Sequence, residues 1–340
     1  MNTRRSVMIS TAALMTSAAL PGRAQQGATL RLSSWLPAAH PVSKFLDKWV
    51  VEVAEKTGGQ VKIEVYHSGQ LGPVTQHYDM VRRGTVDIGF ILHAMNPDRF
   101  PLAALTDIPF LVKSSVQGTA VLNDPELRAK YLDPEHRGVK VLFLCTNQPA
   151  QILTAEKPVR KPEDIHGQRI RFPSPAAKAF LEELGATTVG LPRSAIAENM
   201  QKRVIDGLMM DYGGAGVAYK LGGMVKAATE LDIYVTSFAL VMNPDSYAKI
   251  PASVKKAFDQ TLVGVEREIG AGWDSLNKPG KAALVEGGAQ VIVPTAQERA
   301  PFEAAAAKVR DRILKERESA GLPARQAYDL MQALAKKAAA

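Results

Sequence analysis

The stretch from Gln168 to Leu191, "QRIRFPSPAAKAFLEELGATTVGL", contains two short β-like runs on either side of one helical segment. "QRIRF" and "ATTVGL" are expected to be strands, and "SPAAKAFLEELG" between them is expected to be a helix. Strand, helix, strand is the order found in a mostly parallel sheet with helices on its faces. The stretch therefore predicts an α/β unit.

The helix of this unit has a well-marked start and end. Ser174 is a suitable N-cap and Pro175 occupies the first helical position. An apolar stripe at helical spacing follows, formed by Ala177, Phe180, Leu181 and Leu184, before Gly185 ends the helix. The short strand before it therefore ends next to the N-terminus of a helix.

The same order of elements occurs earlier in the chain. Strands are expected at "TLRLSSW" (29–35), "VKIEVYH" (61–67), "VDIGFIL" (86–92) and "GVKVLFL" (138–144), with helices from 40 to 59 and from 75 to 84 between the first three. The pattern restarts after Cys145 to Ala150 and continues through "SAIAENMQKRVI" and "GLMM". Two α/β units are predicted, with a boundary near Cys145 to Ala150.

Later segments return to these units. "SFALVMN" (237–243) is expected to be a strand, and a long amphipathic helix from about Pro251 is expected to span both units. We expect a first lobe of residues 25–147 with about 237–275, a second lobe of residues 148–236 with about 276–300, and C-terminal helices over 301–340.

The N-terminus, residues 1–24, has the features of an export signal. Arg4 and Arg5 precede an apolar run from Val7 to Leu20, and the pair of arginines is also compatible with a twin-arginine signal. A permanent membrane anchor is the alternative, but the run is shorter than the roughly 18 to 20 residues that a spanning helix needs. We expect an exported chain.

Composition excludes several classes of function. Removing the three arginines of the signal, which holds no acid, lowers the formal charge from +8 to +5. This balance favours small anions, and no basic run is dense enough for nucleic acid. Cys145 is the single cysteine, so no intrachain disulfide or cysteine-based metal cage can form.

Arg171 lies where the strand before the Ser174 helix ends. Ligands of α/β sheets gather beyond the carboxyl ends of the strands, and the free N–H groups of a helix start attract anions. A guanidinium there can hold a carboxylate through two parallel hydrogen bonds. A surface ion pair with Glu163 or Asp164 is the alternative, and alternation alone does not decide between Arg169 and Arg171.

No metal or cofactor is expected. The six histidines do not pair with each other or with acids at metal-binding spacing, and no dinucleotide, phosphate-loop or nucleophile-elbow motif is present. His40 and His93 follow strands and could reach a cleft as hydrogen-bond donors, or face solvent.

The chain resembles the DctP-type solute-binding proteins of tripartite ATP-independent periplasmic (TRAP) transporters. The matching segments occur in order: "SGQLGP", "RRGTVDIGF", "LTDIPFLV", "RKPEDIHGQRIRFPS", "GATTVGLPRSAIAENMQKRVIDGLMM" and "SFALVMNPDSYAKIP". The resemblance implies a two-lobed periplasmic binding protein, type II-like, whose lobes close on a carboxylate and deliver it to the membrane subunits of the transporter.

The resemblance also implies a set of ligand-binding residues. The arginine of its "G-x-K/R-I/L-R-x-P" motif, which binds the substrate carboxylate, falls on Arg171 rather than Arg169. Further implied contacts are Trp35, Leu92, His93, Met95, Ser174, Arg193, Met210, Asp211 and Tyr212. Gln151 stands where some members, including sialic-acid binders, have a second arginine.

Apolar residues stand where a sugar acid would need polar partners. Such a ligand needs these partners because burying unpaired hydroxyls is costly. We therefore expect an aromatic or branched monocarboxylate, including 2-oxo and 2-hydroxy acids. The expected protein is a periplasmic monomer that is not an enzyme. Alternatives are an exported enzyme acting on organic acids, with His93 as base, and a ligand sensor of the same fold.

Overall fold

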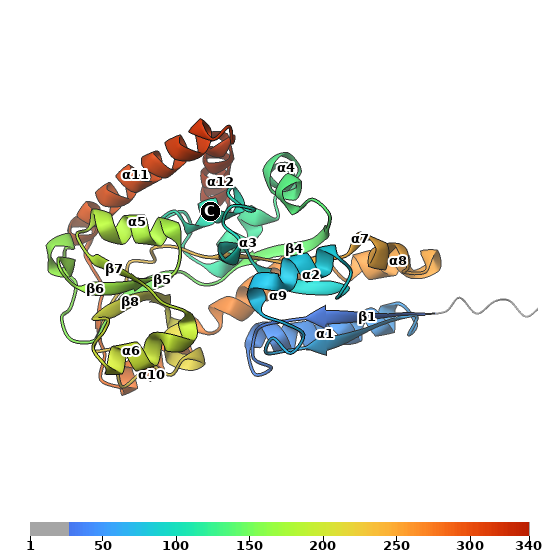
Figure 1. Cartoon of the computed structure of the whole chain (residues 1–340), viewed down its shortest axis with the longest axis horizontal. Helices are drawn as coiled ribbons and strands as arrows, with labels where there is room; N and C mark the ends of the chain where they lie inside the picture. Colours follow the sequence, from blue (N-terminus) through green and yellow to red (C-terminus); the bar gives the residue numbers. More distant parts are fainter. Residues whose placement is uncertain (1–26, 340) are drawn as a thin grey trace, which may run out of the picture.

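The computed structural model describes residues 27–339, so the expected export signal lies outside the described residues. Two sheets divide these residues into the two lobes of Figure 1. The first lobe is built on strands in the order β2-β1-β3-β10-β4: Val61–Tyr66, Ala28–Ser33, Ile88–Leu92, Ser237–Met242 and Lys140–Thr146. The second is built on β11-β9-β5-β8-β6-β7: Gln290–Ile292, Ala227–Thr229, Ala150–Thr154, Gly207–Asp211, Arg169–Phe172 and Thr187–Gly190.

Each sheet contains one strand that runs against the others. β10 is antiparallel to β3 and to β4, so β1 to β4 share one direction. β5 is antiparallel to β8 and to β9, while the other pairs of the second sheet are parallel. The expectation of two mostly parallel sheets is confirmed.

Helices cover the faces of both sheets (Figure 1). They are α1 Pro41–Lys56, α2 His77–Arg82, α3 Ser115–Leu122, α4 Pro125–Leu127, α5 Pro175–Glu183, α6 Ile196–Gln201, α7 Pro244–Ala248, α8 Ala252–Gln260, α9 Val265–Asp274, α10 Asn277–Glu286, α11 Ala296–Ser319 and α12 Ala324–Ala339. Over the described part of the chain, no helix is both long and apolar enough to cross a bilayer.

Two segments outside the helices and strands cross between the lobes, at residues 147–149 and at residues 230–236. The two crossovers lie side by side. The Ala150 amide donates to the Tyr234 carbonyl (2.9 Å), and the Thr236 amide donates to Asn147 Oδ1 (2.7 Å). These hydrogen bonds join the two crossovers into one paired connection, which has the form of a hinge between the lobes.

The single long helix expected from Pro251 is instead three helices. Gly264 adopts φ 83°, a left-handed conformation that ends one helix and precedes the next, and a second break follows Asp274. The run still passes between the lobes, because α9 packs on α1 and α3 of the first lobe whereas α10 packs on the turn η8 (Gly213–Ala218) of the second.

Helix α11 also spans the lobes, along the top of Figure 1. Phe302 and Ala306 in its first half belong to the second lobe's core, whereas Val309 and Leu314 in its second half belong to the first lobe's core. α12 then packs on α3. The C-terminal helices therefore hold the lobes together on the side away from α1.

Candidate functional site

A cavity of about 420 Å³ lies between the lobes, where strands β1, β3, β6 and β7 end. The first lobe contributes Trp35, Val74, Leu92, Ala94 and Met95. The second lobe contributes Arg171, Phe172, Pro173, Gly190, Leu191, Pro192, Arg193, Ser194 and Tyr219, and the second crossover contributes Thr236. The cavity is thus placed where ligands of α/β proteins bind.

Arg171 projects into this cavity from the end of β6. Its neighbour Ile170 faces the core of the second lobe, so alternation along the strand turns Arg171 to the other face. The residue is only 5% exposed, and its Nε donates to the Leu191 carbonyl (3.2 Å). Within residues 27–339 no carboxylate lies within salt-bridge distance of it.

The electrostatic state of Arg171 reflects this isolation. The pKa of its guanidinium is lowered to about 10, chiefly by burial, and the charge of Arg193 contributes to the lowering. A buried cation without a counter-ion is costly, and the cost falls when an anion binds beside it.

Arg169 has a different environment although it is only two residues away. Its guanidinium forms two hydrogen bonds with Asp206, from Nη2 to Oδ1 (2.6 Å) and from Nε to Oδ2 (2.9 Å). This pair is partly exposed and lies away from the cavity. Of the two arginines that alternation left open, Arg171 lines the cavity.

The first-lobe wall of the cavity is aromatic. Trp35 stacks on Phe90 and on Phe238, with ring centroids 6.3 and 6.0 Å apart, and Phe238 stacks on Trp273 at 5.1 Å. Leu92 and Met95 extend the apolar surface. An aromatic side chain on an apolar wall suits a flat apolar ligand.

Ser174 is the N-cap of α5, as expected, and its hydroxyl accepts from the Ala177 amide (3.3 Å). It is 3% exposed and does not line the cavity. Its side chain contacts Asp107, which comes from the first lobe, at the end of the short helical segment η3 (Ala103–Asp107). Burial raises the pKa of Asp107 to about 7 despite the Ser174 contact.

Of the remaining implied contact residues, Arg193 lines the cavity, whereas Gln151, Met210, Asp211 and Tyr212 do not. Gln151 uses its amide within the hinge: Oε1 accepts from Leu231 N and Asp232 N (2.8 and 3.0 Å), and Nε2 donates to Asp232 Oδ1 (2.7 Å). Met210 and Tyr212 lie in the core of the second lobe. Asp211 accepts from Asn147 Nδ2 (3.0 Å) and the Gly214 amide (2.6 Å).

Neither candidate histidine lines the cavity. His93 is fully buried, with Nδ1 against Ser237 Oγ (2.9 Å) and Nε2 against His136 Nε2 (3.0 Å), and burial lowers its pKa well below the usual value. His40 caps α1 by accepting from the Val42 amide, and burial lowers its pKa to about 4. Within residues 27–339 no three His, Cys, Asp or Glu side chains form a potential metal site.

Tyr219 and Thr236 line the cavity but were missed in the sequence. Both lie in irregular segments, one after the turn η8 and one in a crossover, where no hydrophobic period assigns a side chain to a face. The only sequence feature that could have indicated them is their place near a strand: Tyr219 comes after β8, and Thr236 comes directly before β10.

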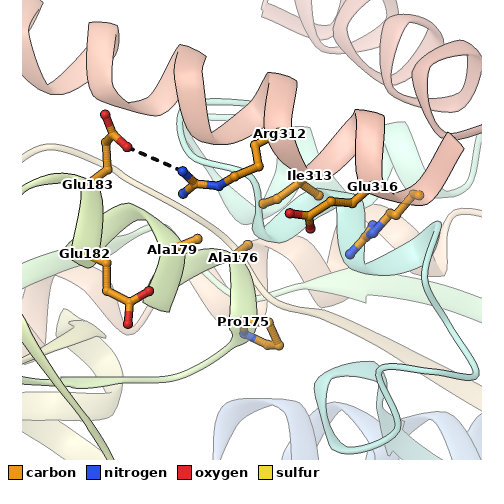
Figure 2. Close-up of a pocket in the computed structure, with 9 residues that line it drawn as sticks. Pro175, Ala176, Ala179, Glu182, Glu183, Arg312, Ile313 and Glu316 are labelled. Carbon is orange, nitrogen blue, oxygen red and sulfur yellow. Dashed lines mark ion pairs between the residues drawn. The ribbon is translucent and has the colours of Figure 1, made fainter. Parts of the chain in front are cut away.

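Another depression, of about 520 Å³, lies between α5 and α11 and is separate from the cavity between the lobes (Figure 2). Its charged groups are largely satisfied within the protein: Arg312 lies 3.6 Å from Glu183, and Arg317 donates to the Pro101 carbonyl. It contains no aromatic wall. The cavity between the lobes is therefore the candidate ligand site.

Comparisons with known proteins agree with the two-lobed fold. The family model described as bacterial extracellular solute-binding protein, family 7 (DctP), matches residues 32–317. A marine metagenome TRAP solute-binding protein, solved with 3-hydroxybenzoate, is 27% identical, with 92% of this chain and 99% of that chain covered and a TM-score of 0.84.

Two further solved structures are similar. A TRAP solute-binding protein from Rhodoferax ferrireducens, in complex with benzoate, is 25% identical over 92% of this chain and 98% of that chain, with a TM-score of 0.83. One from Bordetella bronchiseptica, with bound (R)- and (S)-mandelate, is 25% identical over 91% of this chain and 99% of that chain, with a TM-score of 0.78.

Proposed function

This chain belongs to family 7 of the bacterial extracellular solute-binding proteins, and we propose that its solute is a small aromatic monocarboxylate held by Arg171. It is a TRAP solute-binding protein, which captures a carboxylate and delivers it to the membrane component of a TRAP transporter.

The main support for this proposal is that the guanidinium of Arg171 is buried without a counter-ion in the described part of the chain. It lines the cavity, is 5% exposed, and has no carboxylate partner within the described residues. A ligand carboxylate supplies the missing negative charge and accepts two parallel hydrogen bonds from the free amino groups of the fork. The ligand thereby replaces the solvation that Arg171 lost on folding.

The polarity of the cavity wall argues against ligands with a cationic group. Two arginines line the cavity, together with the hydroxyls of Ser194, Tyr219 and Thr236, but no Asp or Glu does. An ammonium group would therefore meet no counter-charge on the wall. An amino acid is a poor fit, whereas a plain carboxylate suits this set of donors.

The aromatic wall supports a ring on the ligand. Trp35 presents a stacked indole to the cavity, and Leu92 and Met95 offer no hydrogen bonds to hydroxyls. A sugar hydroxyl that faces Trp35, Leu92 or Met95 would be buried without a partner, at a cost of about 1 to 3 kcal/mol. The similar proteins solved with benzoate and 3-hydroxybenzoate support the same ligand class.

Binding and lobe closure are coupled in this proposal. Arg171 belongs to the second lobe and Trp35 to the first, so a ligand that contacts both favours the closed arrangement. The paired crossovers at 147–149 and 230–236 provide the hinge. No catalytic group is required, and His93, the base in the enzyme alternative, is fully buried and does not line the cavity. We place this activity in the periplasm, in keeping with the N-terminal export signal.

The test is a ligand panel measured by thermal shift and calorimetry on the mature protein. Benzoate and 3-hydroxybenzoate should raise the melting temperature in a saturable way, because they bind only the folded chain. Benzamide, which has the same shape without the charge, phenylalanine and glucuronate should not. Binding of glucuronate in preference to benzoate, or equal binding of benzamide, would overturn the proposal.

A further inference from the structure

We infer that Tyr219 is a second carboxylate-binding residue, whose phenol hydroxyl donates a hydrogen bond to the carboxylate that Arg171 holds. This inference rests on the proposed function, because it assigns a further donor to the same bound group. It adds a residue outside the sequence motif that pointed to Arg171.

The backbone that carries Tyr219 is held firmly. The Tyr219 amide donates to the Gly214 carbonyl (2.9 Å) at the end of η8, and η8 packs directly on α10. A Cβ atom added to Gly216 would lie 2.1 Å from the Gly280 carbonyl oxygen, so the two backbones are in direct contact there. Tyr219 therefore follows a segment with little freedom to move, which makes it suited to fixed positioning of a ligand.

The side chain of Tyr219 is half-buried and divided between two environments. Part of it packs against the core of the second lobe, and it also lines the cavity together with Arg171. Within residues 27–339 its hydroxyl has no hydrogen-bond partner. A phenol in such a place retains a donor for a ligand.

Arg171 leaves room for another donor. Its Nε is used by the Leu191 carbonyl, so two amino groups remain for the two oxygen atoms of the ligand. Each carboxylate oxygen has two acceptor positions, so at least one stays open after a two-point contact with Arg171. Tyr219 lines the same cavity of about 420 Å³ as Arg171, so a small ligand can contact both residues.

Tyr234 is the other tyrosine near Arg171, and it is less suited to this role. It is 4% exposed, belongs to the core of the second lobe and does not line the cavity. Among the tyrosines of the described chain, Tyr219 is the one that shares the cavity wall with Arg171.

The test is a calorimetric titration of benzoate into the mature wild-type protein and Tyr219→Phe, with Tyr328→Phe as control. Benzoate is chosen because its carboxylate is its only polar group. Loss of a hydrogen bond to a charged group should weaken binding by about 10-fold to 100-fold in Tyr219→Phe. Tyr328, a buried tyrosine on α12, lies outside the cavity, so its variant should bind as wild type does.

The melting temperature of the unliganded variant separates binding from structure. Weaker binding with an unchanged melting temperature supports the inference. Unchanged affinity would overturn it, and so would a loss that appears only together with a lower melting temperature of the free protein. If wild-type protein binds no carboxylate of the panel, the proposed function itself fails and this inference falls with it.

Discussion

Arg169 and Arg171 show how strongly position decides the role of a side chain. Both belong to β6, yet Arg169 forms a partly exposed pair with Asp206 while Arg171 is buried at the cavity without an acid beside it. The first is a common surface ion pair of small energetic value. The second leaves a charge that a ligand anion can neutralise.

Gln151 stabilises the connection between the lobes through its side-chain amide. Its Oε1 accepts the amides of Leu231 and Asp232, so it anchors one crossover to β5. Gln151→Ala leaves both buried donors unpaired and should lower the free energy of unfolding by about 1 to 3 kcal/mol per group. Urea unfolding measures this loss, and a variant as stable as wild type would contradict it.

An arginine at the end of β6 could be predicted near a ligand because a strand end followed by an N-cap is a local pattern, but the choice of Arg171 over Arg169 depended on the resemblance to the family motif. The place of Tyr219 could not, because the cavity wall is formed by irregular segments from both lobes that meet only in the folded chain. Gln151 was expected near the ligand, but the crossover that occupies its amide is 80 residues later, which no local pattern reveals.

At the scale of elements, the run from α8 to α10 shows the limit of helical periodicity. The apolar positions of α8 and α9 continue in one register across the break, so the pattern predicts a single helix. The break depends on one backbone conformation, φ 83° at Gly264, and it leaves Val263 82% exposed. Strand order and helix caps, in contrast, follow from local residues, as the Ser174 cap of α5 does.

Gly264→Ala tests the importance of this break. A left-handed conformation costs a non-glycine residue about 1 to 2 kcal/mol, so the variant should be less stable by that amount. Benzoate affinity should stay unchanged, because Gly264 lies outside the cavity. Thermal unfolding and a titration check the two parts, and an undiminished melting temperature would show that the break is not maintained by glycine.

At the scale of the whole molecule, Asp107 is a buried carboxyl where the two lobes meet. It comes from the first lobe, contacts the Ser174 cap of the second, and lies within the electrostatic reach of Arg317 on α11 and of Arg193. Burial is the largest influence and raises the pKa of Asp107 from 3.8 to about 7. The carboxyl is therefore protonated in the folded chain at a pH where it is ionised in the unfolded chain.

The sign of the resulting pH dependence follows from proton binding. Between about pH 4 and pH 7 the folded state holds a proton that the unfolded state has released, so Asp107 makes the protein less stable as pH rises. His93 and His136 act in the opposite direction below pH 6.5, because burial lowers their pKa values. Only a comparison of variants isolates the Asp107 contribution.

Asp107→Asn removes the titration and keeps the shape of the side chain. Its free energy of unfolding relative to wild type should increase from pH 5 to pH 8, by an amount on the order of 1 to 3 kcal/mol. Urea unfolding at the two pH values measures the difference. A difference between variant and wild type that does not change with pH would contradict this reading of Asp107.

The central claim is that the Arg171 guanidinium holds the ligand carboxylate, and calorimetric titration of benzoate into wild type, Arg171→Ala and Arg169→Ala tests it most directly. Arg171→Ala should weaken binding by about 100-fold or more, since a charge-assisted two-point contact is lost, while Arg169→Ala should bind nearly as wild type does. Full affinity in Arg171→Ala, or an equal loss in both variants, would contradict it.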